Sequence, residues 1–182
     1  MKYSGHDNIV QVSLMLKEYF DSDSIVNITK DWYNVGEGEN LPDYYGNPVK
    51  GRADVNFYST CFYDLAEVIP ESVSKPFTRV CRLIETMPGV TRASIVAIGP
   101  NSIVPIHIDD ENRPAYDNSF HNNVFTGIIV PQGCEVIIDN KLHVPKAHKY
   151  IPFDAQIPHS ASNPTNEWWV SVLLYIHKTE FK

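Results

Sequence analysis

The chain has 182 residues, of which 43% are hydrophobic and 20% charged, and this composition is typical of a globular protein with one sizeable core. Its formal net charge is −7, and the absence of any basic block argues against a nucleic-acid partner. No apolar run approaches the ~20 residues of a membrane span, and the N-terminus lacks the apolar segment of a signal peptide. We therefore expect a cytoplasmic protein with no membrane partner.

The first half of the chain carries two helical patterns separated by a long loop. Residues 8–20 place apolar side chains at helical spacing, and so do residues 74–87. We expect Ser74 to cap the second helix and Pro88-Gly89 to end it. Between the helices, residues 32–58 are rich in Gly, Asn, Pro and Tyr, which favours a long loop with room for one short strand. A loop of this length in a compact domain is often functional.

The second half of the chain is dominated by short β-rich runs separated by turns. In chain order, these runs are TRASIVAIG, SIVPIHI, NVFTGIIV, CEVIID, KLHV, HKYIPF and WWVSVLLYIH. Short strands without intervening helices indicate an antiparallel sandwich or barrel. We therefore predict a mainly β fold with flanking helices. The expected organisation is one domain over residues 1–182, with a helical and loop region (1–89) packed on a barrel core (90–178).

One of these runs leads into His107-Ile108-Asp109. Residues i and i+2 of a strand share a face, so the His107 ring and the Asp109 carboxylate would lie side by side. Two histidines and one carboxylate on one face of an octahedron leave three open positions, as in non-haem Fe(II) oxygenases. His159, which precedes the final strand, is the best-placed third ligand. The alternative is a hydrogen-bonded His–Asp pair in a structural or ligand-binding barrel, because this short motif alone is weak evidence.

The remaining histidines are weaker candidates for the third ligand. His121 lies in an expected polar loop, and His143 and His148 lie in an expected hairpin. For these three, and for His6, we expect ordinary surface roles. His177, at the end of the last β-rich run, is also considered as a ligand.

Three longer segments carry a family resemblance. PFTRVCRLIETMPGVTRASIVAIGPNSIVPIHIDD is followed by GIIVPQGCEVIIDN and then by YIPFDAQIPHSASN. In content and order these segments resemble the aspartyl/asparaginyl β-hydroxylase family, over residues 76–177. The resemblance implies a double-stranded β-helix, of the jelly-roll or cupin-like kind, that uses Fe(II), 2-oxoglutarate and O2. It also implies His107 and His159 as the iron histidines and Asp109 as the carboxylate ligand, which some members of the family lack.

The sequence departs from the family pattern at the 2-oxoglutarate site. Family members usually place an arginine about ten residues after the distal histidine, where it forms a bidentate pair with the far carboxylate of 2-oxoglutarate. That position is Trp169 here, and Ser171 on the same strand face offers a hydroxyl. An Arg-x-His pair that is common in the family corresponds to Asn123 and Phe125. No lysine or arginine occurs between Lys149 and Lys178.

Three explanations of this departure remain open at the level of sequence. Another basic residue can replace the arginine: Arg92, which shares a strand face with Ser94, or Arg113, which can instead hold a substrate carboxylate. Alternatively, the protein does not use 2-oxoglutarate and takes all electrons from a bound substrate. Finally, the last strand can be aligned in a shifted register. On the first explanation, the residues expected at the cofactor are Arg92, Ser94, Asn123, Trp169 and Ser171.

The expected substrate is a small molecule that enters beside the metal. The pocket would be lined by residues 32–58, residues 110–123 and the final strands, with Asn112, Arg113 and Tyr116 as substrate-binding candidates. A chain of this size has no further domain to recruit a large protein, so we expect hydroxylation of a free amino acid, a short peptide or a related metabolite. The competing functions are a 2-oxoglutarate-independent iron oxidase and a cupin-like metal- or ligand-binding barrel.

The sequence leaves the oligomeric state open. Trp168 and Trp169 are adjacent and therefore point to opposite faces of the last strand. One of them would face outward, where either the partner subunit of a homodimer or a covering helix would bury it.

Overall fold

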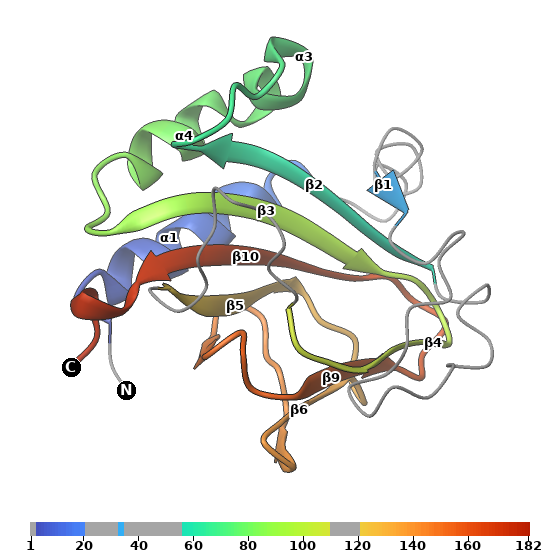
Figure 1. Ribbon diagram of the computed structural model, residues 1–182. Helices are drawn as coiled ribbons and strands as arrows, with labels where there is room; N and C mark the ends of the chain where they lie inside the picture. The colour runs from blue at the N-terminus through green and yellow to red at the C-terminus, as the bar shows by residue number, and fades with distance from the viewer. Residues whose placement is uncertain (1–2, 21–32, 35–55, 110–120) are drawn as a thin grey trace.

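Figure 1 shows the computed structural model of the chain, which describes residues 3–20, 33–34, 56–109 and 121–182. Two antiparallel sheets face each other. The six-stranded sheet has the order β1-β2-β3-β10-β5-β8, and the four-stranded sheet has the order β4-β9-β6-β7. The strands of the larger sheet are β1 (Tyr33–Asn34), β2 (Phe57–Asp64), β3 (Val90–Ile98), β10 (Trp169–His177), β5 (His121–Ile129) and β8 (Tyr150–Phe153). Those of the smaller sheet are β4 (Ser102–His107), β9 (His159–Asn163), β6 (Glu135–Ile138) and β7 (Lys141–His143).

From β3 onward the chain winds between the two sheets. It passes from β3 to β4, back to β5, across to the β6–β7 hairpin, back to β8, across to β9 and back to β10. This alternation is the topology of a double-stranded β-helix. The predicted mainly β fold with flanking helices, of the jelly-roll or cupin-like kind, is thereby confirmed.

The helices cover the outer face of the larger sheet (Figure 1). They are α1 (His6–Lys17), α3 (Glu71–Ser74) and α4 (Thr78–Ile84), with the short 3-10 turns η3 (Lys75–Phe77) and η5 (Lys178–Glu180). Among the described residues, no helix has the length and apolar character needed to span a membrane.

The second predicted helix is divided, which corrects the expectation for residues 74–87. The α-helical hydrogen bonding is interrupted by η3, because Pro76 has no N–H to donate and its ring crowds the preceding turn. Ser74 does not cap a helix, since its hydroxyl donates to the Pro70 carbonyl at 3.3 Å. The final helix ends at Ile84, and Gly89 follows with a φ of +68°.

Strand β10 separates two packed layers. Its residues Val170, Val172, Leu174 and Ile176 are fully buried in the layer beneath the helices, together with Ile9, Val12 and Leu16 of α1. The alternate residues face the space between the two sheets, where Trp169 is fully buried. The helices therefore complete an outer core, and the barrel interior is a separate region that contains the ends of β4 and β9.

Two strands and one residue differ from the sequence expectations. Strands β2 and β9 were not predicted, and β9 has the polar sequence HSASN, which lacks β-branched residues. It is held as a strand by ladders on both sides, to β4 and β6. His121 begins β5 rather than lying in a polar loop, and it pairs with His177 of β10.

Candidate metal centre

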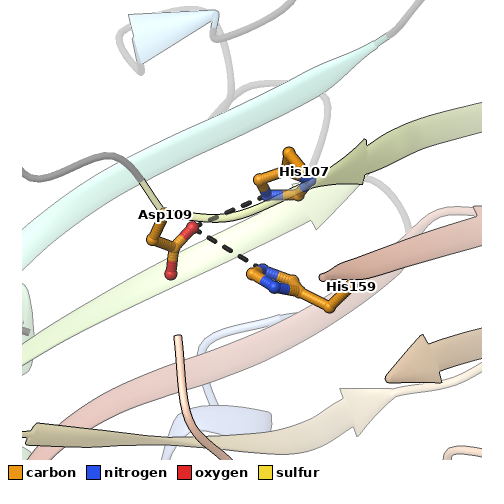
Figure 2. Close-up of side chains that lie close together, drawn as sticks. All are labelled: His107, Asp109 and His159. Carbon is orange, nitrogen blue, oxygen red and sulfur yellow. Dashed lines mark ion pairs between the residues drawn. The ribbon is translucent and has the colours of Figure 1, made fainter. Parts of the chain in front are cut away.

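The structure brings together His107, Asp109 and His159, which are called the metal group below. One ligand atom of each lies within 4.8 Å of the others. His107 is the last residue of β4, and it is paired with His159, the first residue of β9. Asp109 follows β4, where its backbone N–H donates to the Ala155 carbonyl at 3.0 Å. Figure 2 shows the two imidazole rings directed toward the same carboxylate. The three predicted metal ligands thus come from segments that are far apart in the sequence.

The spacing of the three side chains suits a metal ion. The Nε2 atoms of His107 and His159 each lie 3.6 Å from Asp109 Oδ1. This distance is too long for a hydrogen bond. Atoms that bind one ion at about 2.0–2.2 Å lie about 3–4 Å from one another. The donor set therefore fits a divalent metal held between these atoms.

The backbone fixes both imidazole rings in the form that metal binding needs. His107 Nδ1 lies 2.7 Å from the Pro105 carbonyl oxygen, and His159 Nδ1 lies 2.9 Å from the Ile157 carbonyl oxygen. A carbonyl can only accept, so each Nδ1 carries the proton and donates it. Nε2 of each ring is then the atom left for a metal, and it is directed toward Asp109. Such contacts behind a metal-binding histidine set its tautomer and its orientation.

Asn123 and Phe153 hold the other side of the group. Asn123 is fully buried on β5, and its Nδ2 donates to Asp109 Oδ2 at 2.8 Å. Phe153 is paired with Asn123, and its ring centroid lies 4.8 Å from that of His159. The contacts of Asn123 with Asp109 and of Phe153 with His159 were not predicted, because both depend on the register between strands.

The electrostatics of the group are those of a charged carboxylate between two rings. Burial by itself raises the pKa of Asp109, but the close approach of His107 and His159 outweighs it and holds the pKa below its usual value. Burial also tends to lower the pKa of His159, while the Asp109 carboxylate raises it, and the net direction is upward. Without a metal, Asp109 is therefore ionised and is poised to bind a cation.

Arg92 lies on the inner face of the larger sheet, level with the metal group. In the register of the sheet, Arg92 is opposite Tyr175, and Tyr175 is opposite Asn123. Directly opposed residues share a face, so this row faces the barrel interior. Arg92 Nε lies 3.7 Å from Asp64 Oδ2, and its guanidinium carbon lies 5.4 Å from the Tyr175 ring centroid. Asp64 was not anticipated from the sequence because it lies on β2, a strand that was not predicted.

The other predicted cofactor residues lie on the same inner face. Ser94 is two residues beyond Arg92 on β3 and is opposite Leu173. Ser171 and Trp169 are on β10, farther from the Tyr175 row, and Trp169 contacts Phe125 with ring centroids 5.4 Å apart. The substrate-binding candidates Asn112, Arg113 and Tyr116 lie outside the described residues.

The remaining described histidines are not part of the metal group. His121 and His177 contact each other with ring centroids 5.7 Å apart. His148 Nδ1 lies 3.0 Å from the Ser13 hydroxyl, and burial lowers the pKa of this histidine. His6 contacts Tyr150. In the part of the chain that the structure describes, the cluster of metal-binding side chains contains only His107, Asp109 and His159.

Similarity to solved structures is limited to the general architecture. A cupin-2 domain from Rhodospirillum rubrum is 6% identical, with a TM-score of 0.45, and the match covers 80% of this chain and 66% of that one. A predicted oxalate decarboxylase from Thermotoga maritima is 10% identical, with a TM-score of 0.42 and coverage of 82% and 96%. The Cnp3 cupin domain of Schizosaccharomyces pombe is 12% identical, with a TM-score of 0.41, and this chain spans just under two thirds of its length, 66%, while 68% of this chain is covered. No curated protein sequence matches the chain.

A family model gives the decisive comparison. The model of aspartyl/asparaginyl beta-hydroxylase matches residues 23–178. The match includes all three side chains of the metal group and most of the chain. It confirms the resemblance that was found in the sequence motifs. The chain therefore belongs to the aspartyl/asparaginyl β-hydroxylase family.

Proposed function

We propose that this protein is a non-haem Fe(II) oxygenase that uses 2-oxoglutarate and O2 to hydroxylate an unactivated C–H bond of a small substrate. The substrate class is an amino acid, a short peptide or a related metabolite. The observation that carries the proposal is the geometry of His107, Asp109 and His159, in which two fixed Nε2 atoms and one carboxylate oxygen converge. Membership of a hydroxylase family supports it.

The three side chains would hold Fe(II) through His107 Nε2, His159 Nε2 and an Asp109 oxygen. These three ligands would leave coordination positions free for other molecules, and the bound ion would supply the activation of O2. The protein's own residues orient and shield the site. The Pro105 and Ile157 carbonyls accept hydrogen bonds from the two Nδ1–H groups, which leaves Nε2 of each ring as the atom that can bind the metal.

The residues around the ligands restrict motion and solvent access. Asn123 fixes the carboxylate of Asp109 through its second oxygen, so the first oxygen stays directed toward the two rings. Phe153 packs on His159, whose exposed fraction is 8%. Arg92 places a positive charge on the inner face at the level of Asn123, where it can bind an anionic group of the cofactor or the substrate.

A second candidate function is a 2-oxoglutarate-independent iron oxidase. It is favoured by one observation, the buried Trp169 at the position where the family usually has an arginine. In such an enzyme the bound substrate supplies all the electrons that reduce O2. A cupin-like barrel that only binds a metal or a ligand is compatible with the same three side chains.

One experiment separates these functions. The Fe(II)-loaded protein is incubated with 2-oxoglutarate and O2 in the presence of individual amino acids and short peptides, and succinate is measured together with O2 consumption. The proposal predicts succinate formation that rises with the true substrate and is abolished in His159→Ala. Consumption of O2 without succinate would favour the oxidase, and no consumption of O2 with any substrate would favour a binding protein.

A further inference from the structure

The barrel interior contains three buried polar atoms without a hydrogen-bond partner among the described residues. They are Trp169 Nε1, Ser171 Oγ and Asn123 Oδ1. The exposed fractions of these residues are 0%, 1% and 0%. Buried polar groups in native proteins are nearly always paired, and each exception calls for an explanation. Three such atoms in one interior indicate the binding of a polar ligand.

The three atoms belong to residues on one surface that leads away from the metal group. Trp169, Ser171, Leu173 and Tyr175 are alternate residues of β10 and therefore share its inner face. Tyr175 is level with Asn123, whose amide holds Asp109. Ser171 lies beyond Leu173 on this face, and Trp169 lies beyond Ser171. The two donors of β10 thus lie farther along the barrel than the metal ligands, toward the end of the barrel at Trp169, which is called its deep end below.

Among the described residues, apolar side chains surround Trp169 in the barrel interior. Trp169 belongs to a cluster with Ile98, Val104 and Phe125. Of the strands that the structure describes, only β3 and β7 carry an arginine or a lysine, Arg92 and Lys141. Arg92 is level with Tyr175, and the Lys141 side chain is 73% exposed and paired with Asp139. No described strand therefore brings a cation to the deep end of the barrel.

Such an environment selects ligands by their ability to accept hydrogen bonds more than by their charge. The Trp169 indole N–H can only donate, and the Ser171 hydroxyl can donate as well. A ligand that offers no acceptor leaves both donors unpaired in an apolar interior, which is costly. A charged acceptor loses more hydration on burial than a neutral one. Without a nearby cation to compensate for this loss, its binding free energy is little better than that of a neutral acceptor.

We propose that Trp169 Nε1 and Ser171 Oγ form an uncharged pair of donors that binds the far end of the metal-chelating 2-oxo acid. The deep end of the barrel then selects a hydrogen-bond acceptor, either a carboxylate or a carboxamide, rather than a negative charge. This inference rests on the proposed function, because it assumes a 2-oxo acid at the metal. This pair of uncharged donors differs from the single arginine that usually binds the far carboxylate in the family.

The first test compares three ligands of equal chain length. Binding of 2-oxoglutarate, its 5-amide 2-oxoglutaramate and 2-oxopentanoate to the Fe(II)-loaded protein is measured by anaerobic titration calorimetry. Because the donors need only an acceptor, the acid and the amide should have dissociation constants within about tenfold of each other. The third compound ends in a methyl group and should bind at least about tenfold more weakly than either.

The second test removes each donor with little change in shape. Ser171→Ala and Trp169→Phe should each weaken the acid and the amide by about tenfold or more. Neither change should alter the binding of 2-oxopentanoate or of Fe(II). Trp168→Phe, adjacent on the chain, and Ser160→Ala, on β9, are the matched controls and should bind all three ligands as the unmodified protein does. The ligand comparison in the unmodified protein stands even if a variant fails to fold.

The inference is overturned if the amide binds no better than 2-oxopentanoate while 2-oxoglutarate binds well. If Arg92→Gln then abolishes binding of 2-oxoglutarate, the Arg92 guanidinium binds the far carboxylate of 2-oxoglutarate, and the proposed function still stands. Unchanged binding in Ser171→Ala and Trp169→Phe would also overturn the inference alone. If Fe(II) binds but none of the three 2-oxo acids does, the proposed use of 2-oxoglutarate fails together with the inference.

Discussion

At the scale of single residues, the side chains of the proposed metal ligands are fixed by hydrogen bonds that do not involve a metal. His107 and His159 use the same device, in which Nδ1 donates to the carbonyl of the residue two positions earlier. Asp109 is fixed on both sides, by Asn123 at its side chain and by Ala155 at its backbone. The free energy of metal binding is then not used to order the ligands.

This arrangement makes Asn123 a sensitive position. Asn123→Ala removes the donor to Asp109 Oδ2 and frees the carboxylate to rotate. We expect Fe(II) affinity to fall by about 10–100-fold, the usual effect of losing a hydrogen bond to a metal ligand. The measurement is an anaerobic competition titration with a coloured chelator. Asn166→Ala, an exposed asparagine whose side chain contacts Asn101, is the control, and an equal loss there would contradict the role given to Asn123.

The clustering of His107, Asp109 and His159 could be predicted from the sequence, because a short motif contains the first two and the family pattern contains all three. The partners of these ligands could not be predicted. Asn123 contacts Asp109 only because β5 is in register with β10 and β8, and that register is set by packing across the whole sheet. The position of Asp64 beside Arg92 depends in the same way on the pairing of β2 with β3.

At the scale of elements, β10 joins two functions in one strand. Its helix-side residues build the outer core, while Trp169 and Ser171 belong to the barrel interior. The run WWVSVLLYIH predicted a strand, and β10 (Trp169–His177) confirms it. The polar strand β9 was missed because its stability comes from its two neighbours rather than from its own residues.

Because the two faces of β10 have different roles, we expect that a substitution can change stability without changing metal binding. Leu174 is fully buried beneath the helices, so Leu174→Ala should lower the free energy of unfolding by about 2–5 kcal/mol through lost packing and a residual cavity. Fe(II) affinity should stay unchanged. Urea unfolding and Fe(II) titration measure the two effects. Leu142→Ala, at a residue that is 57% exposed, should change stability by less than about 0.5 kcal/mol.

The N-terminal segment is tied to the rest of the fold by Tyr3. The side chain is fully buried, its hydroxyl donates to the Pro88 carbonyl at 2.7 Å, and its backbone pairs with Phe181. Burial and, second, the charge of Glu180 raise the pKa of Tyr3 to about 12 from an ordinary value of 10.0. Folding thus favours the neutral phenol. Its contribution to stability is complete below pH 10 and is lost as the pH rises from 10 to 12.

Tyr3→Phe isolates this contribution. Near pH 8 the variant should be less stable by about 1 kcal/mol, because it lacks the hydrogen bond to Pro88. Between pH 10 and 12 the unmodified protein should lose up to about 2–3 kcal/mol that the variant keeps, so the difference should shrink and reverse. Urea unfolding at several alkaline pH values gives both curves. Parallel curves over this range would show that Tyr3 does not become harder to ionise on folding.

At the scale of the whole molecule, the barrel has two chemically distinct ends. One end holds the metal group and the cation of Arg92, and the other holds apolar side chains with two uncharged donors. The barrel core could be predicted because its β-rich runs are short, apolar and closely spaced. The wider sheet could not, because β2 follows a segment rich in loop-forming residues, and its pairing with β3 is a long-range contact.

The measurement that tests the central claim most directly is an anaerobic titration of Fe(II) into the metal-free protein, followed by thermal unfolding. We expect one ion per chain, and about 2.7 kcal/mol of added stability when free Fe(II) is at a hundredfold excess over the dissociation constant. His107→Ala, Asp109→Ala and His159→Ala should each lose this binding, while His143→Ala on β7 should keep it. Unchanged binding in any of the first three variants, or an equal loss in His143→Ala, would contradict the metal centre proposed here.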